Sequence, residues 1–152
     1  MGFTLAEIIN ELSDPYVLVL YRENLLEQYV SWKIADKNKV WWSTHSNPDT
    51  TVPVTLSALD KFIQEEKQQW AEAMKHIIKS KTMFVKYENL RDDKYTELNR
   101  ILKFFKLGRT DRVFLDMITQ QNPQKIENKV SNYEEIKRHI LQNTDKYTLN
   151  LQ

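Results

Sequence analysis

A short apolar run that passes directly into a helical pattern constrains the fold of this chain more than any other feature. Residues 16–21 read Tyr-Val-Leu-Val-Leu-Tyr and follow Asp14-Pro15. A short, β-branched apolar run of this kind indicates a strand that is buried on both faces, as in parallel sheets. After Arg22 the apolar residues recur at three- and four-residue steps, which indicates one face of a helix: Leu25, Leu26, Tyr29, Val30 and Ile34.

The junction between this strand and this helix is a candidate anion site. Ligands of open α/β sheets bind beyond the carboxyl ends of the strands, and the first turn of a helix offers free N–H groups to a phosphate. Arg22 stands at the junction, and its planar guanidinium matches the oxygens of a phosphate. The alternative is that Arg22 forms an ordinary ion pair with Glu23 or Glu27.

Three stretches of the chain resemble PAPS-dependent sulfotransferases of the bacterial type. The strand that ends at Arg22, followed by a helix with Ser31 about two turns in, resembles the family's site for the 3′-phosphate of the cofactor. Residues 83–90, Met-Phe-Val-Lys-Tyr-Glu-Asn-Leu, with the apolar helical pattern of 98–107, look like the family's next strand, turn and closing helix. Residues 131–136, Ser-Asn-Tyr-Glu-Glu-Ile, are similar to the family's tail. The family's Gly-rich phosphosulfate-binding loop is absent from the sequence.

The resemblance implies a single sulfotransferase-like domain over residues 1–152 that corresponds to the C-terminal portion of the family fold. It implies PAPS or adenosine 3′,5′-bisphosphate as the cofactor, held by Arg22 and Ser31, and sulfuryl transfer to a hydroxyl or amine of an unidentified small molecule or glycan. Two charge-assisted contacts of roughly 1.5–3 kcal/mol each give millimolar affinity or weaker after ordering costs. We therefore expect the phosphosulfate loop to come from elsewhere if this chain takes part in catalysis.

Other residues are weaker candidates for this chemistry. The step from Arg22 to Ser31 is nine residues, whereas cytosolic sulfotransferases use eight, and Glu23 occupies the eighth position before Ser31. The resemblance implies basic residues near the 3′-phosphate at Lys125 and Lys129. Glu88 is interpreted as a structural carboxylate that caps nearby N–H groups. No catalytic base is identified, because the histidines are scattered: His45 in a long loop, His76 at the end of a helix and His139 on an exposed face.

Composition excludes several classes of function. Lys and Arg number 22 against 21 Asp and Glu, a net charge of +1, which favours neither nucleic acid nor an anionic membrane as a partner. No apolar segment approaches the ~20 residues of a membrane span. The N-terminus lacks the pattern of a signal peptide, so a cytoplasmic location is expected. The absence of cysteine and the scattered histidines predict no disulfide and no metal site.

The complete pattern predicts a helix-rich α/β fold, and the resemblance implies that this is a partial P-loop-type three-layer fold. We expect about two parallel strands, at 16–21 and 82–87, joined by a right-handed crossover and covered by five or six helices. The helices are expected at 5–12, 22–35, 55–79, 94–107, 113–118 and 132–140, with a capping box at residues 131–134. The loop 36–54, with Trp41 and Trp42, either faces a substrate or is pinned to the core by these two rings. The polar tail from Gln142 onward is expected to be loosely held.

A second hypothesis makes the chain a non-catalytic helical binding or assembly module derived from the sulfotransferase fold. An unpaired apolar strand edge rarely stays bare in a folded protein. The edge beside residues 16–21 would then pair with a strand of another protein or with a second copy of this chain in a homodimer.

Overall fold

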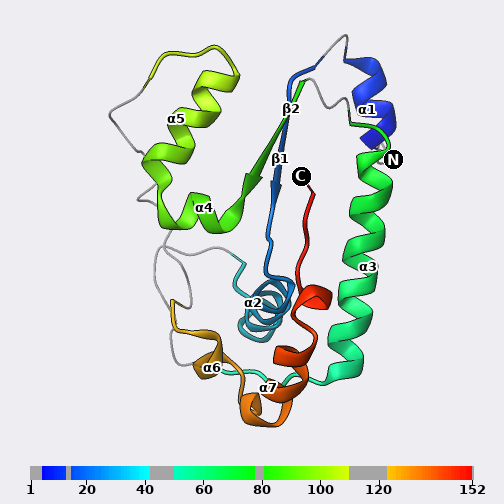
Figure 1. Cartoon of the computed structure of the whole chain (residues 1–152), viewed down its shortest axis with the longest axis vertical. Coiled ribbons are helices and arrows are strands. Elements are labelled where there is room, and N and C mark those ends of the chain that lie inside the picture. The colour runs from blue at the N-terminus through cyan, green and yellow to red at the C-terminus, as the bar shows by residue number, and fades with distance from the viewer. Residues whose placement is uncertain (1–4, 13–14, 42–49, 78–80, 110–122, 152) are drawn as a thin grey trace. The chain divides into compact units, whose positions relative to one another are not determined.

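The computed structural model describes residues 5–12, 15–41, 50–77, 81–109 and 123–151 of the chain. These residues form seven α-helices, one 3-10 helix and a sheet of two strands (Figure 1). The helix-rich α/β class is therefore confirmed. In chain order the elements are α1 (Leu5–Glu11), β1 (Val17–Tyr21), α2 (Leu25–Asn38), α3 (Leu56–Met74), β2 (Thr82–Lys86), α4 (Tyr87–Asp92), α5 (Lys94–Phe104), α6 (Ile126–Lys129), α7 (Tyr133–Gln142) and η3 (Thr144–Tyr147).

The chain divides into two compact units. The first comprises residues 1–23, 65–112 and 150–152, and it holds both strands with α1, α4 and α5. The second comprises residues 24–64 and 113–149, and it holds α2, α6, α7 and η3. The boundary passes between Glu23 and Asn24 and again within α3. The single domain expected over residues 1–152 stays a prediction.

The two strands of the first unit pair in parallel, as predicted. Val17 lies opposite Thr82, and Tyr21 lies opposite Lys86. Both strands therefore end at the same edge of the sheet, and the chain leaves each carboxyl end for a helix. Figure 1 shows β1 and β2 side by side with α4 at the end of β2.

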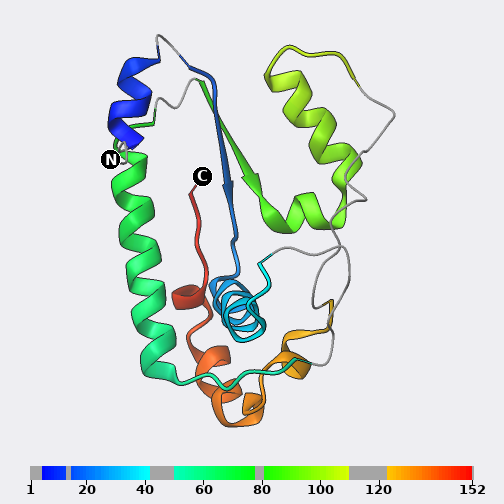
Figure 2. The same ribbon diagram turned by 180° about the vertical axis from the view of Figure 1, so that it is seen from behind.

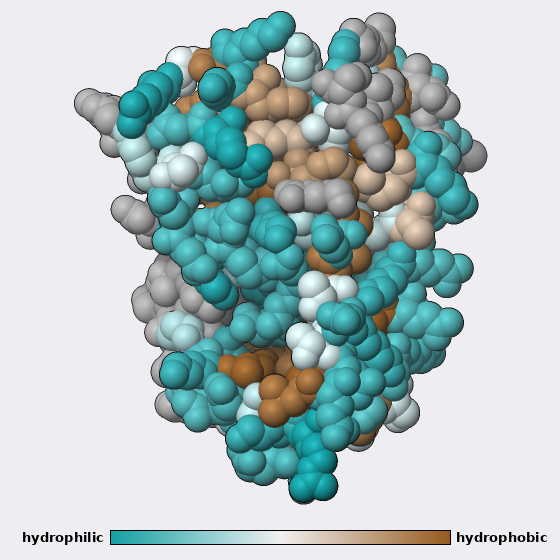
Figure 3. Space-filling model, in the orientation of Figure 1, coloured by the Kyte–Doolittle hydropathy of each residue, from teal (hydrophilic) through white to brown (hydrophobic). Residues whose placement is uncertain are grey.

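The prediction that the first strand is buried on both faces is wrong. Val19 and Tyr21 are buried, whereas Leu18 and Leu20 are 39% and 49% exposed and Tyr16 is 44% exposed. Exposure alternates because successive side chains of a strand point to opposite faces. In the described residues the sheet has only two strands. Leu18 and Leu20 lie opposite Met83 and Val85, which are buried on the same face, so this face is covered over β2 and left exposed over β1. Figure 3 shows apolar side chains at the surface over this region.

Arg100 of α5 links an ion pair within this helix to the backbone of β2. The Arg100 side chain donates to the Glu97 carboxylate at 3.0 Å and to the backbone carbonyl of Phe84 in β2 at 2.8 Å. Glu97 is only 6% exposed, so its charge is balanced inside the protein. The helix begins where the Asp93 carboxylate accepts the backbone N–H of Thr96 at 3.0 Å.

The far end of α5 differs from the expected glycine cap. Lys106 adopts the left-handed conformation, with a φ of 59°, while Gly108 has no positive φ. The N–H of Leu107 bonds to the carbonyl of Leu102 at 2.8 Å. A left-handed residue past the last turn turns the chain back onto the helix and satisfies its carbonyls.

Helix α2 of the second unit has the predicted apolar face. The Asn24 side chain accepts the N–H of Glu27 at 3.0 Å at its start, and Lys39 ends it in the left-handed conformation with a φ of 56°. The buried residues are those of the sequence pattern: Leu25, Leu26, Tyr29, Val30 and Ile34. The helix extends to Asn38, so it includes the first residues of the predicted loop.

The segment before α3 is held by the region around α6 and α7. Val52 N–H donates to the carbonyl of Lys129 at 2.9 Å, and Ser131 N–H donates to the carbonyl of Val52 at 3.0 Å. The Asn132 amide accepts the N–H of Val54 and donates to the carbonyl of Val54, both at 2.9 Å. The predicted capping box is therefore wrong: Asn132 is the N-cap residue of α7, and its side chain bonds to the backbone of Val54 and accepts no backbone N–H of the helix.

The tail of the chain is ordered up to Leu151, contrary to the sequence prediction. Tyr147 and Leu149 are 4% and 5% exposed. Thr148 forms an antiparallel bridge with Asn24, and Figure 2 shows the segment after α7 running beside α2. Lys146 also pairs with Asp60 of α3, with 2.7 Å between Nζ and Oδ2. The two buried side chains, Tyr147 and Leu149, hold this C-terminal segment in place although most of its residues are polar.

Two of the expected features fall outside the described residues. These are the helix predicted over 113–118 and most of the long loop, including Trp42, His45 and Pro48. No helix in the described part of the chain is both long enough and apolar enough to cross a bilayer.

Candidate functional site

The candidate site lies at the carboxyl edge of the sheet in the first unit. Arg22 and Glu23 follow β1, and Tyr87 and Glu88 follow β2. The pairing of Tyr21 with Lys86 in the last register position brings these four residues to one place. We call Tyr21, Arg22, Glu23, Lys86, Tyr87 and Glu88 the strand-end cluster.

Arg22 is positioned by an aromatic ring. Its guanidinium carbon lies 4.0 Å from the centroid of the Tyr87 ring, a cation–π contact that fixes the plane of the guanidinium. The N–H donors of an arginine lie in that plane, whereas the contact uses its face. Arg22 therefore lies just beyond the carboxyl end of β1, half-buried and in contact with the Tyr87 ring.

Glu23 pairs across the sheet edge with Lys86. Lys86 Nζ lies 2.5 Å from Glu23 Oε1, and the two side chains are 24% and 35% exposed. The hydrogen bond to Glu23 raises the pKa of Lys86 above its ordinary value, and burial opposes this effect. The backbone N–H of Glu23 donates to Glu88 Oε2 at 3.1 Å, so the interpretation of Glu88 as a structural cap of nearby N–H groups is confirmed.

The side chains of the strand-end cluster lie on two sides of the strand ends, because successive side chains of a strand point to opposite faces. Tyr21, Glu23 and Lys86 share one side of the strand ends, as their pairing and register show, while Arg22 contacts Tyr87. The Tyr21 side chain is 2% exposed. Burial raises the pKa of Tyr21 most, the nearby Lys86 lowers it, and the Glu23 and Glu88 carboxylates raise it further.

Ser31, the other predicted phosphate ligand, lies in α2 with its side chain exposed. Arg22 belongs to the first compact unit and Ser31 to the second. Their joint contact with one phosphate stays a prediction.

The weaker candidates lie in other places. Lys125 is exposed just before α6, whereas Lys129, at the end of α6, is 9% exposed and buried in the second unit. His76 is exposed, with its Nε2 3.7 Å from a carboxylate oxygen of Glu72. His139 is half-buried with its ring edge-on to Tyr147, at 6.3 Å between centroids, so its predicted exposed position is wrong. His45 lies outside the described residues.

Among the described residues, neither Trp41 nor a group of metal ligands adds to the candidate site. Trp41 is 60% exposed, so the interpretation that this ring pins the loop to the core is wrong. Among the described residues, no three His, Asp or Glu side chains are grouped closely enough to hold a metal ion.

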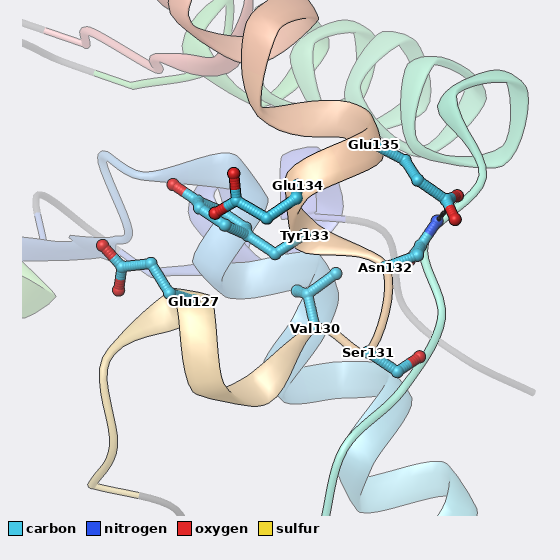
Figure 4. A pocket seen from close by; sticks show the side chains of 7 residues that line it. All are labelled: Glu127, Val130, Ser131, Asn132, Tyr133, Glu134 and Glu135. Carbon is cyan, nitrogen blue, oxygen red and sulfur yellow. Dashed lines mark hydrogen bonds between the residues drawn. The ribbon is translucent and has the colours of Figure 1, made fainter.

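A hollow of about 260 Å³ lies on the second unit around the start of α7. Figure 4 shows its lining, which the sequence did not single out: Glu127, Val130, Ser131, Asn132, Tyr133, Glu134 and Glu135. Asn132 Nδ2 donates to Glu135 Oε2 at 3.3 Å. Three carboxylates in the lining make this hollow unsuited to a phosphate or a sulfate, because like charges repel.

Comparisons with known proteins give no relative. Neither the protein-family models, nor the curated proteins, nor the solved structures contain a match for this chain.

The structure adds three residues to the site that the sequence analysis did not assign: Tyr21, Lys86 and Tyr87. Each is adjacent to the end of an apolar run, as Arg22 is. The expected strands 16–21 and 82–87 end at one edge because they are parallel, but aligning them by their ends would have set Tyr21 opposite Tyr87, one residue away from its observed pairing with Lys86. The register between the strands was the missing information.

Proposed function

We propose that this chain is a sulfotransferase-like domain whose strand-end cluster holds the 3′-phosphate of PAPS or of adenosine 3′,5′-bisphosphate. The observation that carries the proposal is the place of Arg22: it stands beyond the carboxyl end of a parallel strand, with its guanidinium braced on Tyr87 at 4.0 Å. This edge is where open α/β sheets bind phosphorylated ligands. The proposal includes a partial P-loop-type three-layer fold.

The surroundings of Arg22 support this role. A carboxylate next to a phosphate is unfavourable, and Glu23 follows Arg22 directly. The Glu23 carboxylate is engaged by the Lys86 ammonium at 2.5 Å, so its charge is balanced. The hydroxyl of Ser31 is exposed on α2, which suits the second phosphate ligand that the resemblance implies.

The reaction in this proposal is the transfer of a sulfuryl group from PAPS to a hydroxyl or amine acceptor. The acceptor oxygen or nitrogen forms the new bond to sulfur and loses a proton, and the sulfur–oxygen bond to the cofactor breaks to release adenosine 3′,5′-bisphosphate. The transfer also needs a base, a cation at the leaving phosphate and a loop of N–H groups around the phosphosulfate. We assign this chain the 3′-phosphate clamp and place the phosphosulfate loop on another segment or chain.

The proposal is tested by titrating the ¹⁵N-labelled protein with adenosine 3′,5′-bisphosphate. Because two charge-assisted contacts supply roughly 3–6 kcal/mol before ordering costs, we expect millimolar binding that weakens with salt. Amide shifts should centre on residues near Arg22 and Ser31. Arg22→Ala should abolish the shifts, and Ser31→Ala should weaken binding.

A matched control is available in α4. Arg91 is exposed and bonds to Asp92, with 2.6 Å between Nε and Oδ1. Arg91→Ala removes one positive charge from the same unit but leaves the strand ends intact, so it should bind the nucleotide as the unaltered protein does. Shifts confined to regions away from Arg22 and Ser31, or equal losses in Arg22→Ala and Arg91→Ala, would refute the proposal.

The uncovered face of β1 favours a second candidate function, a non-catalytic assembly module. Leu18 and Leu20 of β1 are 39% and 49% exposed, and Tyr16, just before this strand, is 44% exposed. A homodimer through this strand would cover them and pair its edge. Sedimentation should then show a dimer that Leu18→Lys dissociates, whereas Leu141→Lys, at a 65% exposed position on α7, leaves it intact. A monomer at all concentrations would contradict this function.

A further inference from the structure

The buried hydroxyl of Tyr21 is an unused donor at the strand ends. Tyr21 is 2% exposed, and within the described residues its hydroxyl makes no hydrogen bond of normal geometry. The backbone of Leu151 approaches the hydroxyl and lowers its pKa, as an N–H donor does, so the O–H itself has no acceptor. Buried polar groups are nearly always hydrogen-bonded. An unpartnered hydroxyl at this place indicates that an acceptor is missing.

The two carboxylates whose charges act on Tyr21 are engaged elsewhere. The charges of Glu23 and Glu88 both raise the pKa of Tyr21. Glu23 bonds to Lys86, and Glu88 accepts the backbone N–H of Glu23. Lys86 carries three N–H donors and sits opposite Tyr21 in the strand register.

We propose that Tyr21 and Lys86 form a second oxyanion site, in which a phosphate or sulfate group accepts hydrogen bonds from the Tyr21 hydroxyl and the Lys86 ammonium. The ligand class follows from the donors: one cation and one neutral hydroxyl, at a sheet edge where a tetrahedral oxyanion offers several acceptor oxygens. The site lies on the Lys86 side of the strand ends, and it does not depend on Arg22 or Ser31.

Glu23 is the internal competitor of this site. Its carboxylate occupies the Lys86 ammonium at 2.5 Å, so an incoming oxyanion has to displace it. Glu23 can leave without disturbing the backbone, because its N–H is held separately by Glu88. The pair is 24–35% exposed, which leaves the Glu23 side chain a route to solvent. Glu23 therefore sets the affinity of the site.

The test compares anion binding by the unaltered protein and Glu23→Gln. Sulfate, inorganic phosphate and methyl phosphate are titrated at constant ionic strength against chloride, and the amide shifts of Tyr21, Glu23 and Lys86 are followed. Glu23→Gln should bind with an apparent Kd at least tenfold lower than that of the unaltered protein. In that background Lys86→Met should abolish saturable binding, and Tyr21→Phe should weaken it several-fold.

Two controls separate this site from other effects. Glu72→Gln alters an exposed Lys–Glu pair of the same unit and should leave anion binding unchanged. Arg22→Ala combined with Glu23→Gln should keep the tight binding, whereas the nucleotide site of the proposed function requires Arg22. Methyl phosphate binding as tightly as inorganic phosphate indicates an ester as the natural ligand, and weaker binding indicates the free ion.

The inference is overturned by either of two results. One is an equal Kd for Glu23→Gln and the unaltered protein, including the absence of saturation in both. The other is saturable binding in Glu23→Gln that survives Lys86→Met. Loss of nucleotide binding in Arg22→Ala with either result would leave the proposed function standing.

Discussion

The buried Glu97–Arg100 pair gives the sharpest prediction about stability. Arg100→Ala removes the bonds of the guanidinium to Glu97 and to the Phe84 carbonyl, and it leaves the carboxylate of Glu97, 6% exposed, without its partner inside the first unit. Breaking a buried pair from one side costs about 3–5 kcal/mol, and a bond from a charged donor to a carbonyl is worth about 1.5–3 kcal/mol. Because the Arg100 side chain is 45% exposed, we expect less than the loss for a fully buried pair, about 2–3 kcal/mol in the free energy of unfolding.

The double variant separates the two contributions. Glu97→Gln combined with Arg100→Ala removes the buried charge while it keeps the shape of the side chain. It should be more stable than Arg100→Ala alone by about 1 kcal/mol or more, since the cost of an unpaired buried charge is the larger part. Urea unfolding followed by circular dichroism measures all three variants.

A surface pair provides the control for this comparison. Lys75→Ala breaks the exposed Lys75–Glu72 pair of the same unit, and exposed pairs contribute little, so the urea midpoint should not move measurably. An Arg100→Ala variant as stable as the unaltered protein would refute the role of the pair. So would a double variant less stable than Arg100→Ala, because the buried charge would then not be the cause.

Three further predictions concern caps and the tail. Asp93→Ala should destabilise α5 at neutral pH and not at acid pH. The hydrogen bond from Thr96 lowers the pKa of Asp93 in the folded protein. The stabilisation by the Asp93 carboxylate is therefore present above the unfolded-state pKa and is lost as the pH falls through the lower folded-state pKa. Urea midpoints of the unaltered protein and of Asp93→Ala test this, measured between about pH 2 and pH 7 to cover the titration of carboxyl groups. A difference in stability between the two proteins that grows toward acid pH would contradict it. Asn132→Ala should cost about 1–3 kcal/mol, since the buried Val54 loses both bonds to its backbone; an unchanged urea midpoint would contradict it. Deletion of residues 143–152 removes two buried apolar side chains, worth roughly 3–6 kcal/mol at most, and should lower the melting temperature; an unchanged melting temperature would show that the tail does not stabilise the fold.

Local pattern was enough to predict the strands and the helix between them. The runs 16–21 and 82–87 are short and apolar, and the face of α2 repeats at helical steps, so each was identified from neighbouring residues alone. Burial was not predictable in the same way. Leu18 and Leu20 are as apolar as core residues, but the cover that buries their partners Met83 and Val85 does not extend over β1 in the described structure.

The predictions of helix caps and of site residues failed where the interacting residue lies far away along the chain. The spacing Ser131-x-x-Glu134 fits a capping box, but Asn132 bonds to Val54, which is 78 residues away. Arg22 was identified because it stands next to its strand. Lys86 and Tyr87 were not, since their place beside Glu23 and Arg22 depends on the register between two strands that are more than 60 residues apart.

The central claim, an anion site at the strand ends, is tested most directly by the ¹⁵N titration with adenosine 3′,5′-bisphosphate of the unaltered protein, Arg22→Ala and Arg91→Ala. The account predicts millimolar binding with shifts near Arg22 and Ser31, which is lost in Arg22→Ala and retained in Arg91→Ala. Binding that persists in Arg22→Ala, or shifts that avoid the strand ends, would contradict it.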